Sequence, residues 1–423
     1  MEIISKYLDC RAVRGPWQIA GCTESGFSGA VVIPALAESA TLMETLCSLA
    51  QNPYHELSRF LVLVVVNNRE DALAADRTDN LSTLGLLNSG NASHSKLRLA
   101  WVDAASPGLE LPNKSGGVGL ARRIGLDLAL TRLNHIDYDP ILVCLDADTL
   151  VRPDYLPALV RHFDQNVAGA AVIPFRHQQG ESPEGRQAIT RYELFLRSYV
   201  LGLSQAASPY GFHTVGSAMA CRASAYVKMG GMNSRTAGED FYFLQQMART
   251  VGVGQVRGTV VYPSPRPSHR VPFGTGRSVS RRLAGEDGAI LFYKIDCFRV
   301  LAEWLALVSI HADMGSAVPM SRVMEVSPCL VEYLDTVSFE EIWDKLRRNS
   351  NGRLALLTAF NGWFDGLKTM KLIHHLSAGP YPRCEPDLAV PGLLEWAGLS
   401  AVNCLEGQLE LLRRVQLGED YEG

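Results

Sequence analysis

The chain has 423 residues, of which 47% are hydrophobic and 20% are charged, and its formal net charge is -4. A chain of this length predicts roughly two or three domains, or one large domain with an appendage. Its composition is that of a globular protein with a full core, and its slight acidity argues against nucleic acid as a partner.

The cysteines and the apolar stretches predict a cytoplasmic location. Nine cysteines are scattered along the chain without a C-x-x-C pair, so we expect reduced thiols and neither disulfides nor a zinc site. The N-terminal residues lack the layout of a signal peptide. The longest apolar stretch, 290–310, contains Lys294, Asp296, Arg299 and Glu303, which predicts an amphipathic helix and no transmembrane segment. Peripheral membrane contact stays open, and nothing indicates an oligomeric state.

Apolar runs of strand length recur in the first half of the chain. They are GAVVIP (29–34), FLVLVVV (60–66), LRLAWV (97–102) and ILVCL (141–145). All except LRLAWV are nearly continuous in apolar residues, which is typical of strands buried on both faces of a parallel sheet. Helical patterns lie between the runs, so we expect an α/β fold with right-handed βαβ units. Ligands of such folds bind beyond the carboxyl ends of the strands.

The second half of the chain changes character. Further strands are predicted at 170–175, 213–222 and 257–263, and from about residue 285 one helical pattern follows another. We therefore expect a sheet domain over 1–282, with its core from about residue 29, and an α-helical accessory region over 283–423.

Polar residues follow the first two strands. Glu38 ends the segment PALAE, where it could accept hydrogen bonds from a ribose or a base, or simply favour a helix N-terminus. Asn67 follows the second strand, and its amide suits either a planar base or a turn.

The segment 111–123, LPNKSGGVGLARR, joins glycines to positive charge. Lys114, Gly117 and Arg122 could let a phosphate approach the backbone beside cations. The segment is neither a dinucleotide fingerprint, because Arg122 takes the place of the third glycine, nor a P-loop, because no Gly-Lys-Ser/Thr closes it. An anion site and a plain helix start with surface arginines both stay open.

Two carboxylates stand directly after the fourth apolar run, in CLDADT. Asp146 and Asp148 leave a buried strand two residues apart, a placement that suits a hard divalent cation also bound by diphosphate oxygens and water. Haloacid dehalogenase phosphatases also use an Asp-x-Asp pair, but they place Thr or Val where this chain has Leu150.

Two later segments complete the candidate site. Glu239 and Asp240 precede an apolar helical stretch, where they could include a general base or cap the helix. The stretch 264–282 has five arginines, one histidine and no acid, which favours a loop that folds over an anion rather than a solvated basic loop. In it, His269 could join Asp148 at a metal, and Arg270 and Arg277 could contact a diphosphate.

These segments, in this order, resemble nucleotide-sugar glycosyltransferases of the GT-A fold, family 2 type. The resemblance rests on VVIPALAE (31–38), LDADT (145–149) and the GGM and AGED sequences within 230–240, and it covers about residues 29–282. It implies a GT-A, Rossmann-like, mostly parallel sheet flanked by helices, and it leaves the α-helical C-terminal region uncovered. It also implies a metal-binding transferase with Mn²⁺ or Mg²⁺, a nucleotide-diphosphate sugar as donor and a hydroxyl compound as acceptor.

The resemblance also assigns roles to individual residues. It implies that Asp146 contacts ribose or sugar, that Asp148 binds the metal, and that Asp240, with Glu239 beside it, is the base of an inverting displacement. The segment from Gly216 and Ser217 to Arg222 matches the acceptor side. The other implied nucleotide contacts are Pro34, Ala35, Glu38, Asn67, Lys114, Gly117 and Arg122. The family usually has Asp where this chain has Asn67, which leaves the base open.

Three alternatives stay open. Relatives that transfer glucose or mannose to glycerate-type acceptors retain configuration and use a late His as a metal ligand; if His269 is that residue, Asp240 is not the base. A sugar-nucleotide nucleotidyltransferase would carry a Gly-rich loop after the first strand, where this chain has PALAESA. A binding protein without catalysis is disfavoured by the intact acids Asp146, Asp148 and Asp240.

Overall fold

The computed structural model describes residues 2–89, 96–266, 290–400 and 402–418. Its contacts divide the chain into two compact units. The sheet unit comprises Met1–Gly180, Thr214–Arg277 and Val415–Gly423, and the helical unit comprises Glu181–His213 and Ser278–Arg414. The domain boundary predicted at 282/283 lies outside the described residues.

An eight-stranded sheet forms the core of the sheet unit, in the order β1-β4-β3-β2-β5-β8-β7-β9. Neighbouring strands from β4 to β5 are parallel, whereas β1 is antiparallel to β4, and β8 is antiparallel to β5 and β7. The strands are β1 Ile19–Gly21, β2 Gly29–Ala35, β3 Phe60–Asn67, β4 Arg98–Ala104, β5 Ile141–Cys144, β7 Ala170–Val172, β8 Met219–Arg222 and β9 Val253–Gln255.

The strands that the apolar runs predict are confirmed. Every residue of β2 and β3 is buried, as their continuous apolar sequences require of strands covered on both faces. The prediction for 257–263 is confirmed only as a short strand outside the main sheet, since β10 (Val261–Tyr262) pairs with β6 (Leu150–Val151). The mixed, mostly parallel sheet with flanking helices confirms the α/β class that the sequence predicts.

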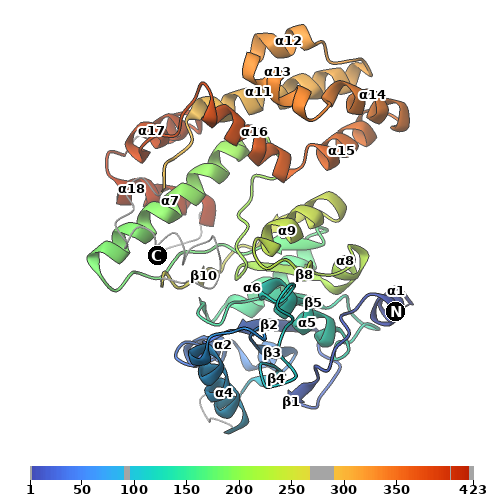
Figure 1. Ribbon diagram of the computed structural model, residues 1–423, viewed down its shortest axis with the longest axis vertical. Helices are drawn as coiled ribbons and strands as arrows, with labels where there is room; N and C mark the ends of the chain where they lie inside the picture. Colours follow the sequence, from blue (N-terminus) through green and yellow to red (C-terminus); the bar gives the residue numbers. More distant parts are fainter. Residues whose placement is uncertain (1, 90–95, 267–289, 401, 419–423) are drawn as a thin grey trace. The chain divides into compact units, whose positions relative to one another are not determined.

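Helix α5 (Val118–Leu130) covers β2 and β3 and brings polar residues to the edge of the sheet (Figure 1). A Cβ at Gly125 would lie 2.9 Å from Cγ2 of Val65, so the glycine allows the helix to lie close to the strands. The other helices of the sheet unit are α1 Glu2–Cys10, α2 Leu42–Leu49, α3 Tyr54–Leu57, α4 Ala74–Ser89, α6 Tyr155–Gln165, α8 Ala223–Lys228 and α9 Glu239–Thr250.

The helical unit confirms the helical C-terminal region. It also includes one helix that the sequence analysis did not predict, in a segment that lies within the predicted sheet domain 1–282. This helix, α7 (Pro183–Gln205), starts at a Ser182 cap and packs against α11 and α17 (Figure 1). The other helices of this unit enclose an aromatic core, in which the Trp304 and Phe339 ring centroids lie 4.8 Å apart. These helices are α11 Ile295–Met314, α12 Met320–Val326, α13 Pro328–Thr336, α14 Phe339–Asn349, α15 Arg353–Trp363, α16 Gly366–Ala378, α17 Pro386–Trp396 and α18 Leu405–Leu417. None of the described helices is long and apolar enough to cross a membrane.

Candidate functional site

The residues predicted from strand ends meet at one edge of the sheet. Because β3, β2 and β5 are parallel neighbours, their carboxyl ends lie together (Figure 1). Asn67 is the last residue of β3, Glu38 follows β2, and Asp146 and Asp148 follow β5. Pro34 and Ala35 are the last two residues of β2 and are buried.

Arg122 links two of the predicted acids. Its side chain, on α5, is only 3% exposed, and its guanidinium forms ion pairs with Asp146 and with Glu239 at the start of α9. A Cβ at Gly216 would lie 2.8 Å from Nη1 of Arg122, so glycine lets the segment before β8 pass beside the guanidinium. Arg122 thus joins the end of β5 to the first turn of α9. In the described residues it contacts carboxylates, which the sequence analysis did not foresee.

Asp240 differs from its neighbour Glu239. Burial raises the pKa of Asp240 to about 7, the negative charges of Glu239 and Asp146 add to the rise, and Arg122 opposes it. The carboxylate of Asp240 is partly buried and accepts a hydrogen bond of 2.7 Å from the backbone N–H of Phe241. Burial also raises the pKa of Glu239, which is held by Arg122. Asp240 therefore titrates near neutral pH, well above the ordinary range of an aspartate.

A second arginine joins two further predicted acids, Asp148 and Glu38. Nε of Arg266 lies 3.0 Å from Oδ2 of Asp148, and its guanidinium also pairs with Glu38. The Arg266 side chain is 28% exposed, in contrast to the 3% of Arg122. Arg266 belongs to the basic stretch 264–282, but no sequence signal singled it out. His269, Arg270 and Arg277 of that stretch lie outside the described residues.

The site has more negative than positive groups among the described residues. Five carboxyl groups and two guanidinium groups interact there, so an anionic diphosphate would need further positive charge. The carboxyl groups are those of Glu38, Asp146, Asp148, Glu239 and Asp240, and the guanidinium groups are those of Arg122 and Arg266.

This excess and the oxygen donors fit a hard divalent cation. Asp148, within the described residues, is not part of a group of three His, Cys, Asp or Glu donors close enough to share an ion. Diphosphate oxygens and water would therefore complete the coordination. A cation at Asp148 would also compete with Arg266 for its carboxylate, because Arg266 now forms an ion pair with it.

Asn67 offers an acceptor to a ligand. Its Oδ1 is buried and has no hydrogen-bond partner among the described residues, an arrangement that costs free energy unless a donor arrives. The neighbouring amides are fixed, since Nδ2 of Asn80 donates to Oδ1 of Asn68 at 2.8 Å and to the Asn67 carbonyl at 3.1 Å.

Helix α4 also holds the loop after β2. Asn80 accepts a hydrogen bond of 2.9 Å from the N–H of Ala37, and Asp79 accepts one of 2.9 Å from the N–H of Ser39. Ala37 has φ of 53°, a left-handed conformation that is uncommon for a residue with a side chain. Asp79 and Asn80 thus position the backbone beside Glu38. The sequence analysis missed both, because polar residues on a surface helix carry no signal of this role.

The glycine segment before α5 packs against the loop that precedes α9. A Cβ at Gly117 would lie 2.8 Å from Cα of Thr236, and one at Gly119 would lie 2.9 Å from the carbonyl oxygen of Asn233. These glycines therefore bring α5 close to the segment that carries Glu239, which accounts for them without a ligand. Lys114 is exposed.

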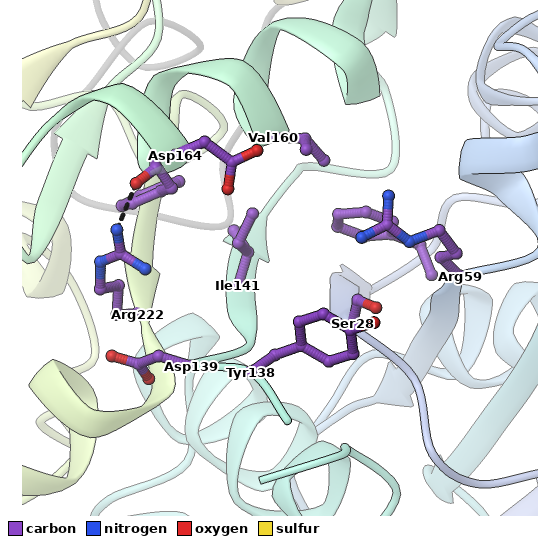
Figure 2. Close-up of a pocket in the computed structure, with 10 residues that line it drawn as sticks. Ser28, Arg59, Tyr138, Asp139, Ile141, Val160, Asp164 and Arg222 are labelled. Carbon is purple, nitrogen blue, oxygen red and sulfur yellow. Dashed lines mark hydrogen bonds between the residues drawn. The ribbon is translucent and has the colours of Figure 1, made fainter. Parts of the chain in front are cut away.

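A shallow pocket lies at the other end of the strands (Figure 2). Ser28 precedes β2, Ile141 begins β5, and Arg222 ends the antiparallel β8, where it donates to the Phe163 carbonyl. Of the residues that the sequence analysis assigned to the site, Arg222, the last residue of the segment matched to the acceptor side, lines this pocket, whereas the predicted acids do not. We therefore separate the pocket from the acid cluster of the candidate site.

Comparisons with known proteins match part of the chain to a family model and most of it to solved structures. Residues 141–283 match the model of glycosyl transferase family group 2, a segment that includes Asp146, Asp148, Glu239 and Asp240. The curated proteins yield no significant match. Among solved structures, S. aureus TarS 1-349 in complex with UDP-GlcNAc is 16% identical, with 75% of this chain and 89% of that chain covered and a TM-score of 0.41. The mannosyltransferase PcManGT from Pyrobaculum calidifontis, in complex with GDP-Man and Mn²⁺, is 15% identical, with 99% and 93% covered and a TM-score of 0.38.

Proposed function

We propose that the chain transfers a sugar from a nucleotide-diphosphate sugar to a hydroxyl acceptor, a function supported by the match of residues 141–283 to the model of glycosyl transferase family group 2. One observation carries the proposal. Asp240, with a pKa of about 7, is electrostatically coupled through Arg122 and Glu239 to Asp146 at the carboxyl edge of the sheet. A base and a donor-side acid thus belong to one cluster, as a direct displacement requires.

The donor would bind along the strand ends. The unpaired Oδ1 of Asn67 would accept a hydrogen bond from the base or ribose, and Glu38 lies on the adjacent strand end. Asp146, which is fixed by Arg122, would face the ribose or the sugar.

Proton transfer would fall to Asp240. A base with a pKa near the working pH is largely ionised and still takes a proton readily. Asp240 would deprotonate the acceptor hydroxyl as it attacks the anomeric carbon, which inverts the configuration of the sugar. Arg122 would hold the Glu239 and Asp146 carboxylates in place through its two ion pairs, so that Glu239 positions the site and Asp240 takes the proton.

A divalent cation, Mn²⁺ or Mg²⁺, would be held by Asp148 and would offset the charge of the leaving diphosphate. Arg266 would then release the Asp148 carboxylate, and its guanidinium would become available to a phosphate. The predicted phosphate contacts Arg270 and Arg277 would add positive charge. A metal bond from His269 belongs to the retaining alternative, in which Asp240 is not the base.

Donor binding can be tested by thermal shift and calorimetry with UDP, GDP and their sugars, with and without Mn²⁺. We expect at least one nucleotide to raise the Tm, and Mn²⁺ to increase this shift. Asp148→Ala should remove the Mn²⁺-dependent part, whereas Asp164→Ala, which alters an exposed acid at the opposite strand ends, should not. If no nucleotide binds under either condition, the donor assignment is wrong. If Asp148→Ala binds as the wild type does, only the metal assignment fails.

The products separate the alternative functions. A glycosyltransferase releases a nucleoside diphosphate, whereas a sugar-nucleotide nucleotidyltransferase releases pyrophosphate, and a binding protein releases neither. The anomeric configuration of the product, read by NMR, then distinguishes inversion through Asp240 from retention. The cytoplasmic location stays a prediction.

A further inference from the structure

The helical unit contains a cysteine, a glutamate and a histidine that the proposed function does not use. Cys329 and Glu332 lie on α13, and His375 lies on the neighbouring helix α16. Their ligand atoms, Sγ, a carboxylate oxygen and a ring nitrogen, all lie within 4.8 Å of one another. We propose that these residues form a binding site for a borderline-soft divalent cation, with Zn²⁺ the best match.

The distances are close to those of a zinc tetrahedron. Sγ of Cys329 lies 3.6 Å from Oε2 of Glu332, and the same oxygen lies 3.7 Å from Nε2 of His375. Bonds of about 2.0–2.3 Å from zinc to O, N and S place neighbouring ligand atoms of a tetrahedron about 3.3–3.7 Å apart. Two of the three pairs thus already stand near the required separation.

The histidine supplies an independent observation. Its Nε2 is buried and has no hydrogen-bond partner among the described residues, and 3.7 Å to Glu332 is too long for a hydrogen bond. A buried, unpaired ring nitrogen costs free energy that a metal bond would remove. The ring itself is held beside Tyr333, whose centroid lies 5.8 Å away.

The chemistry of the donors selects the metal. A thiolate together with an imidazole favours Zn²⁺ over the Mg²⁺ or Mn²⁺ that carboxylates prefer. The Glu332 side chain is 68% exposed, so water can reach a fourth position. Burial and the charge of Glu332 raise the pKa of the Cys329 thiol, and binding therefore releases a proton and strengthens as the pH rises.

The site would tie α13 to α16. The sequence analysis expected no zinc site because it sought paired cysteines, whereas here one helix supplies Cys and Glu at i, i+3 and a second helix supplies His. A bound ion would stabilise the helical unit, since it binds the folded form and not the separated helices.

The full-length chain, first stripped of metal with a chelator, can be titrated with Co²⁺ and then Zn²⁺. We expect one equivalent of Co²⁺ to produce a thiolate-to-cobalt charge-transfer band that Zn²⁺ abolishes. Cys329→Ser should lose the band, whereas Cys404→Ser, which alters an exposed thiol of the same unit, should keep it. Cation binding at Asp148 involves no thiolate, so it gives no such band.

The glutamate gives a test that does not risk the fold. Glu332→Gln is isosteric and largely exposed, and it should weaken Zn²⁺ binding at least about tenfold, since even outer-shell changes cost this much. Zn²⁺ should raise the Tm of the wild type and of Cys404→Ser, but not of Cys329→Ser or His375→Gln. The absence of a band in the wild type, a band that survives in Cys329→Ser, or equal Zn²⁺ affinity in Glu332→Gln would overturn the proposal.

Discussion

Each unit of the molecule contains a buried network of ion pairs, and the two differ in charge balance. In the sheet unit, one guanidinium, that of Arg122, contacts Asp146 and Glu239. In the helical unit, the fully buried Glu193 accepts hydrogen bonds of 2.8 Å from Nε of both Arg197 and Arg413. The first network leaves acid in surplus, whereas the second pairs two acids, Glu193 and Glu410, with two arginines.

This difference indicates that the first network belongs to a reactive site and that the second stabilises the fold. Surplus acid in a buried place forces a carboxyl group to hold its proton near neutral pH, and Asp240 with its pKa of about 7 shows the result. The guanidinium groups around Glu193 do not lose their protons, so positive charge stays beside its carboxylate. The first arrangement suits proton transfer, and the second suits the docking of α7 onto the other helices.

The largest expected effect comes from removing the surplus acid. Asp240→Asn should lower the transfer rate by about 10²–10⁴-fold, because the general base is lost, while the affinity for the donor stays unchanged. Rapid-quench assays and calorimetry on the same preparation measure the two quantities. Full transfer activity in this variant would show that the acid surplus is not catalytic.

Removing the central charge should destabilise both networks. Arg122→Met and Glu193→Gln each remove a charge with which buried groups of opposite charge form ion pairs, which costs about 3–5 kcal/mol of unfolding free energy. Calorimetric unfolding at pH 5.5 and pH 8 measures each effect.

The pH dependence of these losses should distinguish the networks. In Arg122→Met the remaining carboxyl groups have folded pKa values raised above those of the unfolded chain, so stability is kept at low pH and lost as the pH rises. In Glu193→Gln the guanidiniums stay charged, so the loss should be equal at both pH values. If the unfolding free energies of the two variants depended equally on pH, the proposed difference between the two networks would be wrong.

A smaller effect concerns the pH profile of activity. The base form of Asp240 is the active one, so kcat/KM should rise with pH and level off above about 7. In Glu239→Gln a neighbouring negative charge disappears, the pKa of Asp240 falls, and activity at pH 6 relative to pH 8 should increase several-fold. Glu410→Gln, which alters an acid paired with Arg413 in the helical unit, is the matched control and should leave the pH profile of activity unchanged. An unmoved profile in Glu239→Gln would remove Asp240 as the titrating group.

Sequence patterns predicted the strands and the acids at their ends, but not how the acids pair. The apolar runs at 60–66 and 141–145 require buried parallel strands, and the placement of Asp146 follows from the end of β5. The bond from Arg122 to Glu239 joins residues that are distant along the chain, so no local pattern reveals it.

Helix α7 was missed for a related reason. It buries Arg191, Glu193 and Arg197, so charged residues occupy positions where an amphipathic pattern would show apolar ones. Ion pairs with residues that are distant along the chain, such as Arg413 with Glu193, offset the free energy that burying these charges costs.

The smallest expected effect concerns the partly buried arginine at the same edge. The Arg266 side chain is 28% exposed, so water screens its ion pair with Asp148 more than it screens the buried pairs of Arg122, and the pair can exchange. Arg266→Gln should therefore strengthen Mn²⁺ binding in the absence of nucleotide by about two- to fivefold, the factor that a solvent-screened pair supplies. Calorimetry of Mn²⁺ binding to the variant measures this, and Arg152→Gln, which alters a partly exposed arginine paired with Asp154, is the control. Weaker Mn²⁺ binding in Arg266→Gln would mean that Arg266 holds Asp148 in position for the cation and does not compete with it.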